Sequence, residues 1–169
     1  MKQEKETSIK EDLLFLGLKV FIFGALLAVT FFFIFGICRI SDNMMNPAFK
    51  DGDLALYYRL QKELHPSDAI VLEKNGKTQV RRVIAVAGDT VNLTEEGLDI
   101  NGYLQQEQGI YTETLPYKEG TVFPVTVGQD EYFVLGDERI SAEDSRMYGL
   151  VKKEEIKGTV ITLLRRRGF

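Results

Sequence analysis

The sequence predicts a mainly β domain preceded by one N-terminal transmembrane helix. The first observation is a run of nineteen uncharged residues, 20–38, close to the amino end. The second is a change beyond this run, from helical periodicity to short alternating segments rich in β-branched and aromatic residues. We therefore expect two parts: a cytoplasmic tail and anchor at 1–38, and a β domain at 39–169.

The uncharged run is long enough to cross a bilayer. As a helix it would rise about 28 Å, against a hydrocarbon core of about 30 Å. Ser8 and Glu11 have the spacing of a capping box, which predicts that the helix begins near Ile9. A cleaved signal peptide is the alternative, but its apolar region would be shorter and would end in small residues. We expect residues 20–38 to contact membrane lipid.

Lysines are concentrated before the apolar run. Four precede it, and only two basic residues follow it closely: Lys2, Lys5, Lys10 and Lys19 before, Arg39 and Lys50 after. Because basic residues favour the cytoplasmic side, we expect a single-pass protein of the cell membrane with a cytoplasmic N-terminus and an extracytoplasmic domain.

The β domain is expected to contain short strands joined by tight turns. We expect strands at 53–60, 68–74, 78–86, 90–93, 98–100, 103–106, 131–137 and 158–164. Asn75-Gly76 and Asn101-Gly102 fall between such segments, and both residue types tolerate the positive φ of a hairpin turn. Residues 93–127 are expected to form a subsidiary lobe, and residues 141–149 a short helix.

Composition argues against several kinds of partner. The net charge of −4 and the pI of about 5.2 argue against nucleic acid, which requires a basic surface. With one His and one Cys we expect neither a metal site nor a cofactor. The basic run Arg165 to Arg167 is expected to be a solvated tail, with binding to anionic headgroups or a wall polymer as the alternative.

Three motifs occur in a recognisable order after the apolar run. They are Met44-Met45-Asn46-Pro47 with Gly52-Asp53, Arg81-Arg82-Val83-Ile84 with Gly88-Asp89, and Gly136-Asp137 with Asp144-Ser145-Arg146 and Gly149. This order resembles that of the type I signal peptidases, membrane-anchored serine proteases that trim signal peptides. The resemblance covers almost the whole chain, and it implies a signal-peptidase-like β domain of coiled antiparallel sheets.

The resemblance places the family's nucleophilic serine at Met44 and its general-base lysine at Arg81. A thioether has no proton to lose and forms no hydrolysable ester, so Met44 cannot replace a serine. A guanidinium stays protonated at any accessible pH, so Arg81 cannot act as a base. The resemblance also places Ala142 where a serine orients the lysine, and Asp42 where a hydroxyl assists the oxyanion hole. A carboxylate there would repel a developing oxyanion.

The remaining family positions are expected to serve the scaffold and a binding cleft. Asp137, Asp144 and Arg146 are expected to form a structural polar network. The expected peptide-binding cleft is lined by Asp42, Met44, Met45, Arg81 and Val83. An extended peptide can add to such a cleft as a β-strand, which requires backbone and shape but no nucleophile.

We therefore expect an inactive signal-peptidase-like protein that binds a peptide or protein partner. Signal-peptidase-like proteins that accompany sortase-built pili in Gram-positive bacteria, streptococci among them, resemble it most, which implies a role in pilus assembly. The expected partner is a pilin, a sortase or a pre-protein. One alternative is an active peptidase that uses Ser41 and Lys77. Regular strands would, however, hold both far from residues 44 and 81, the positions of the family's catalytic dyad. A second alternative is a regulatory subunit of an active signal peptidase.

Overall fold

The computed structural model describes residues 2–61 and 63–165, and it divides into two compact units, Met1–Phe35 and Gly36–Phe169. The division falls three residues before the expected one after Cys38. Each unit is described by itself.

The first unit is one helix, α1, which spans Lys2–Ile34. Its segment Glu11–Ile34 is long and apolar enough to cross a membrane. The expected start near Ile9 is wrong, because the helix already includes residues 2–8, and Ser8 lies within it rather than at its cap. These first residues include several Lys, Glu and Gln and no Gly or Pro, so nothing in them opposes a helix.

The helix also ends earlier than the apolar run does. Residues Phe35–Arg39 form strand β1, so the last four residues of the expected span, 35–38, are not helical. A Cβ on Gly36 would overlap the ring of Tyr57, so this glycine allows the strand to lie against that ring. The 24 residues from Glu11 to Ile34 would still rise about 36 Å, which is enough to span.

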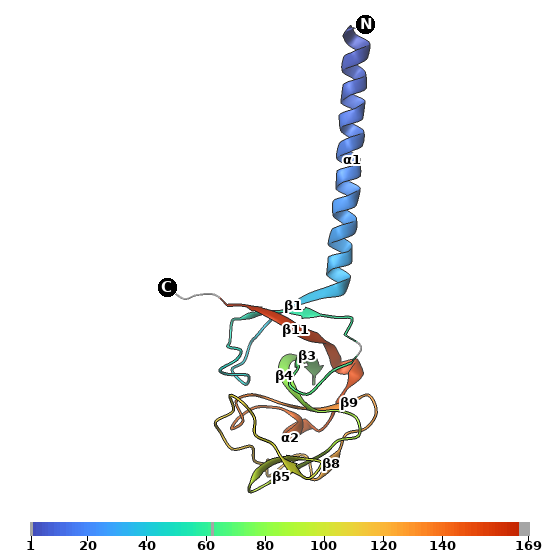
Figure 1. Ribbon diagram of the computed structural model, residues 1–169. Coiled ribbons are helices and arrows are strands. Elements are labelled where there is room, and N and C mark those ends of the chain that lie inside the picture. Colours follow the sequence, from blue (N-terminus) through green and yellow to red (C-terminus); the bar gives the residue numbers. More distant parts are fainter. Residues whose placement is uncertain (1, 62, 166–169) are drawn as a thin grey trace, which may run out of the picture. The chain divides into compact units, whose positions relative to one another are not determined.

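The larger sheet of the second unit has seven strands in the order β1-β2-β11-β3-β4-β9-β10 (Figure 1). After β1 its members are β2 Leu54–Tyr58, β3 Ala69–Lys74, β4 Lys77–Ala85, β9 Glu131–Leu135, β10 Val151–Lys152 and β11 Ile156–Leu164. Strand β11 pairs antiparallel with both β2 and β3, so the C-terminal strand lies inside the sheet. Strand β4 is likewise paired on both sides, with β3 and β9.

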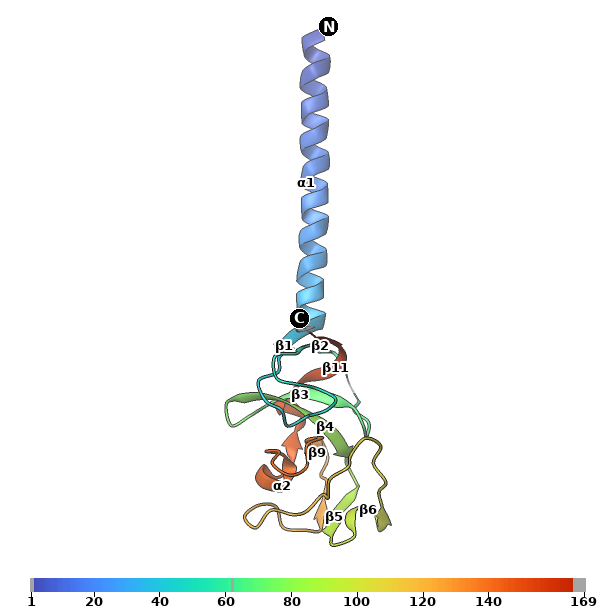
Figure 2. The ribbon, with the colours of Figure 1, turned by 90° about the vertical axis from the view of Figure 1, so that its left-hand side faces the viewer.

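The smaller sheet has four antiparallel strands in the order β7-β6-β5-β8. They are β5 Thr90–Thr94, β6 Gly97–Ile100, β7 Tyr103–Leu104 and β8 Val125–Thr126. Within the domain, Figure 1 and Figure 2 both show β5 far from β2 and β11, with β3, β4 and β9 between. Strands β6, β7 and β8 and the end of β5 lie in the segment 93–127 expected to form a subsidiary lobe, while residues 105–124 form no strand.

Most predicted elements are confirmed. All eight expected strands are present within a few residues, and the expected short helix is α2, Ser145–Tyr148. Both Asn-Gly turns join paired strands, with positive φ at Asn75, Gly76, Asn101 and Gly102. Strands β1, β8 and β10 and the 3-10 turn Lys153–Glu155 were not predicted. Strands of two residues are too short to show a period, and β1 was read as helix.

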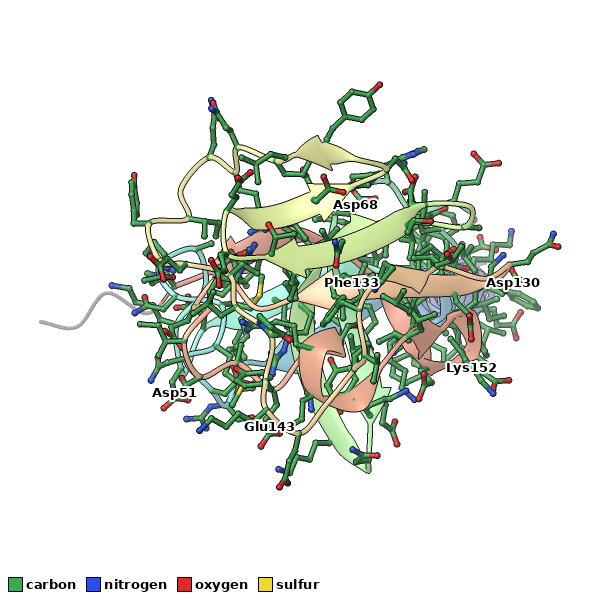
Figure 3. All side chains as sticks on the ribbon, turned by 90° about the horizontal axis from the view of Figure 1, so that it is seen from below. Asp51, Asp68, Asp130, Phe133, Glu143 and Lys152 are labelled. Carbon is green, nitrogen blue, oxygen red and sulfur yellow. The ribbon has the colours of Figure 1, made fainter. Side chains whose placement is uncertain are left out.

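The core fills the space between the two sheets, and two further clusters pack against β3. One cluster joins β4 and β9 to the smaller sheet, with Phe133 fully buried in it. Figure 3 shows Phe133 near the middle of the domain, whereas Asp51, Asp130 and Lys152 lie toward its outline. Because β4 packs on this core, the segment that carries Arg81 is held firmly in place.

Candidate functional site

Met44 lies in the loop between β1 and β2. Backbone bonds from Ile40 to Asp53 and from Gly52 to Ile40 close this loop at its base. The half-buried thioether lies 2.9 Å from Nη2 of Arg81, and the Glu143 backbone N–H is 3.2 Å from the same sulfur. Met44 thus fills the space beside residue 81 with a side chain that cannot ionise.

Arg81 projects from β4 into the interior, and its side chain is completely buried. Its guanidinium donates from Nε to the Glu143 carbonyl at 2.8 Å, and from Nη1 to the Val80 carbonyl. Nη1 also lies 3.5 Å from the Asp42 carboxylate. The guanidinium donates hydrogen bonds and offers no lone pair to accept a proton, so the structure offers no base at this position.

Asp42 contacts both dyad positions. One carboxylate oxygen accepts the Met44 backbone N–H at 3.0 Å, and the other is the oxygen that faces Arg81. An oxyanion hole requires N–H donors that are free to receive the developing negative charge. Here the N–H of residue 44 already donates to the Asp42 carboxylate, so it is not free to bind an oxyanion. The negative charge of the carboxylate would also repel an oxyanion at this place.

Ala142 is fully buried against Gly136. A Cβ on Gly136 would overlap both the Ala142 side chain and the Met44 carbonyl, so the glycine permits this close packing. The Met44 carbonyl in turn accepts the Glu138 N–H at 3.0 Å. The segment 136–142 therefore holds the Met44 loop by backbone contacts. At residue 142 the side chain is a methyl group, which cannot form a hydrogen bond.

Two buried ion pairs support this region. Asp144 and Arg146 form one, with Nε and Nη2 donating to the two carboxylate oxygens at 2.9 and 2.8 Å. The Asp144 carboxylate also accepts the Gly136 N–H, and the Arg146 guanidinium lies over the Tyr117 ring at 4.7 Å. Asp137 belongs to the other pair, with Arg82, which raises the pKa of that guanidinium. The expected network of three residues is thus divided between two pairs.

An open groove of about 840 Å³ lies between β4 and β6, a volume in the range usual for ligand sites. One side is formed by Pro47 and Ala48, which follow Met44 closely, and by Arg82, which follows Arg81. The segment 105–110 forms the facing wall. Some of the residues that line the groove are therefore close sequence neighbours of residues 44 and 81. In the described ranges, 2–61 and 63–165, no cluster of His, Cys, Asp or Glu is arranged to hold a metal.

Comparison with known proteins decides the family. The family model described as "Signal peptidase, peptidase S26" matches residues 13–164. The chain belongs to the signal peptidase family. Signal peptidase I of Bacillus licheniformis is 30% identical over 94% of this chain and 92% of its own length, and that of Bacillus amyloliquefaciens is 31% identical over the same shares. A crystal structure of a signal peptidase I from Enterococcus faecalis, 29% identical, covers 60% of this chain and 98% of its own, with a TM-score of 0.49.

Within this signal peptidase scaffold, the expected cleft residues do not all border the groove. Only Val83 does, and its side chain is fully buried, so it supports the groove from beneath rather than facing a ligand. Met45 is fully buried in a core cluster with Phe49 and Tyr57, so it cannot contact a ligand in an open cleft. Adjacent residues in a turn point in different directions, and here Met44 turns toward Arg81 while Met45 enters the core.

The displaced dyad considered for an active signal peptidase is not assembled. Ser41 is exposed in the loop after β1. Lys77 is in the last pair of the β3–β4 hairpin, opposite Lys74, and its ammonium lies 3.6 Å from Glu143. The structure gives no contact between Ser41 and Lys77 in the part of the chain that it describes.

Sequence reasoning missed one arginine beside the groove and misplaced another. Arg139 is completely buried and donates to Gly136 O, to Thr114 Oγ1 and, through both terminal nitrogens, to Glu107. Glu107 lies in the wall 105–110, so this pair fixes that wall to the domain. No motif marks a pair 32 residues apart.

Arg165 is the arginine that sequence reasoning misplaced. It donates from Nε and Nη2 to the buried Asp53 carboxylate, and from Nη2 to the Ala48 carbonyl. Arg165 is exposed, as expected for a solvated tail, but its ion pair with Asp53 holds it in place, while Arg166 and Arg167 lie outside the described residues. The guanidinium of Arg165 holds the pKa of Asp53 below its usual value.

Proposed function

We propose that this protein is a membrane-anchored, catalytically inactive member of the signal peptidase family that binds an extended peptide or protein segment. The observation that carries the proposal is the contact set of Met44, Arg81 and Asp42. A thioether, a buried guanidinium and a carboxylate contact one another at the positions that the motif order assigns to a nucleophile, a base and an oxyanion donor, which supports the proposal.

Each substitution removes a different stage of one mechanism. Without a hydroxyl at residue 44 no acyl intermediate forms, and without a titratable amine at residue 81 no proton is abstracted. The Asp42 carboxylate opposes negative charge on a tetrahedral intermediate. Three independent losses at one centre argue for a scaffold that has been kept for binding.

The groove supplies the means of binding. It is open to solvent and large enough for an extended chain, and its walls combine apolar side chains with amide groups. Recognition of an extended chain by backbone and shape needs no nucleophile, so the loss of the dyad leaves it intact.

The partner we propose is a pilin or its sortase, so that the protein assists sortase-dependent pilus assembly. The support for this step is the resemblance to the signal-peptidase-like proteins that accompany sortase-built pili. An extracytoplasmic domain on a membrane anchor would be at the surface where such assembly occurs.

Two experiments test the proposal. Full-length protein in detergent is expected not to cleave a pre-protein that the Bacillus licheniformis signal peptidase I cleaves under the same conditions. Cleavage that disappears in Ser41→Ala or Lys77→Ala would replace the proposal with an active peptidase.

The second experiment uses a photoreactive residue at Ala48, on the groove wall, in living cells. We expect crosslinks to a pilin or sortase, and none from the same residue at Glu95, which is exposed and outside the groove. Crosslinks mainly to an active signal peptidase would instead identify a regulatory subunit.

A further inference from the structure

The groove has an apolar floor and a wall rich in glutamine. Ile84 of β4 and Leu98 and Ile100 of β6 line its floor, where Ile84 and Leu98 are almost fully buried and Ile100 is the most exposed of the three. The wall 105–110 carries three glutamines, Gln105, Gln106 and Gln108, and all three are exposed. Glutamine amides both donate and accept hydrogen bonds, so this wall suits the backbone of an extended chain.

Most of the charges that line the groove are already neutralised. Arg82 forms a two-point ion pair with Asp137, at 2.7 and 2.5 Å. Glu107 forms a two-point ion pair with the buried Arg139. Each of these carboxylates is held by a guanidinium, so neither presents a net charge to a ligand.

Asp89 is different. It lines the groove and is half-buried, and its two carboxylate oxygens accept from the Val86 backbone N–H and from Nδ2 of Asn101, both at close range. Both donors are uncharged, so these bonds orient the carboxylate and leave its negative charge in place. Each oxygen also keeps an unused lone pair that can accept a further donor.

From this charge pattern we propose that the groove binds an extended segment containing a lysine or arginine, whose cationic head pairs with Asp89. Small or apolar neighbours of the basic residue lie over Ile84, Leu98 and Ile100. The inference rests on the proposed function and specifies its ligand. A charge in a partly enclosed groove is screened less than one on an open surface, so it can discriminate between ligands.

The test uses full-length protein in detergent and three fluorescent capped peptides of alternating Val and Thr. They are identical except for one central residue, which is Lys, norleucine or Glu. Fluorescence anisotropy is expected to show the Lys peptide binding about tenfold more tightly than the Glu peptide, with norleucine between them, as one partly exposed charge pair predicts. Added salt should reduce this difference.

The variant Asp89→Asn is expected to abolish the preference, and Glu95→Gln, which removes a carboxylate outside the groove, is expected to keep it. Because the peptide series on the unmodified protein is sufficient alone, a folding defect in Asp89→Asn does not weaken the test. Equal binding of the three peptides, or preference for Glu, would overturn the basic-segment inference while peptide binding stood. Binding of none of them, together with no crosslinks from Ala48, would overturn the proposed function itself.

Discussion

At the scale of single residues, the proposed loss of catalysis involves Asp42 as well as residues 44 and 81. The Asp42 carboxylate bonds the N–H of residue 44 and faces residue 81. A lysine at position 81 would lie near this carboxylate, which would raise the lysine pKa and keep the amine protonated. We therefore expect Met44→Ser with Arg81→Lys to give only residual cleavage of a pre-protein.

Adding Asp42→Ser and Ala142→Ser to that pair removes the carboxylate and returns a hydroxyl beside the lysine. Cleavage is expected to rise about a hundredfold over the two-substitution variant, the size of one restored oxyanion donor. Gel-based cleavage at matched protein concentration measures both variants. Full activity in the two-substitution variant would show that Asp42 is no obstacle.

The Asp144–Arg146 pair provides a prediction about stability. Both side chains are almost inaccessible to solvent. Arg146→Ala leaves an unpaired buried carboxylate and also uncovers the Tyr117 ring, so it is expected to destabilise the domain by about 3–5 kcal/mol. Chemical denaturation of the full chain measures this. Lys153→Ala, which breaks an exposed pair with Asp130, should change little, and equal effects would contradict the assigned role.

How far the sequence could predict these residues depends on where their partners lie. The motifs assign residues 44, 81 and 142 to positions in a family pattern from their order along the chain alone. The sulfur of Met44 contacts Arg81, which is 37 residues away in the sequence, and the Met45 side chain is buried in the core. Both facts depend on how the loop folds against β4, which no local period encodes.

At the scale of elements, the C-terminal strand controls the groove wall through Arg165. Strand β11 lies beside β2, and Arg165, which follows it, holds Asp53 and the Ala48 carbonyl. The loop 40–53 is therefore fixed at its base by the end of the chain. Arg165→Ala is expected to lower the Tm and to weaken binding of the Lys peptide, because Ala48 borders the groove.

The effect on Tm should depend on pH. The pKa of Asp53 is lowered chiefly by hydrogen bonds from Arg165, so the pair stabilises the fold above the unfolded pKa of about 3.9. This stabilisation is lost as the pH falls through the folded-state pKa. Thermal melts should thus show a deficit for Arg165→Ala at pH 7 that shrinks below about pH 4. A deficit independent of pH would contradict the assignment.

The elements that sequence reasoning located best are those with a local signature. The hairpin β3–β4 has alternating apolar residues and an Asn-Gly turn, and both appear where expected. Strand β1 was missed because Phe35–Arg39 continues an apolar run, and only pairing in the sheet makes it extended. The same tertiary pairing places the C-terminal strand between β2 and β3.

At the scale of the whole molecule, the anchor determines which compartment the groove faces. Four lysines precede the apolar stretch, whereas Arg39 and Lys50 are the basic residues that closely follow it. Basic residues are retained on the cytoplasmic side, so the domain should face outward. In a Cys38→Ser background, a membrane-impermeant maleimide applied to intact cells is expected to label Glu119→Cys and to spare Gln3→Cys.

Lysis should make both sites reactive, which controls for local accessibility. The charge argument also predicts that replacing Lys2, Lys5, Lys10 and Lys19 by glutamine reduces labelling at residue 119, because the bias that orients the helix is then removed. Labelling at residue 3 in intact cells of the unaltered anchor would place the groove in the cytoplasm. A pilin or sortase at the cell surface could then not reach it, and the proposed partner would be wrong even if the groove binds a basic segment.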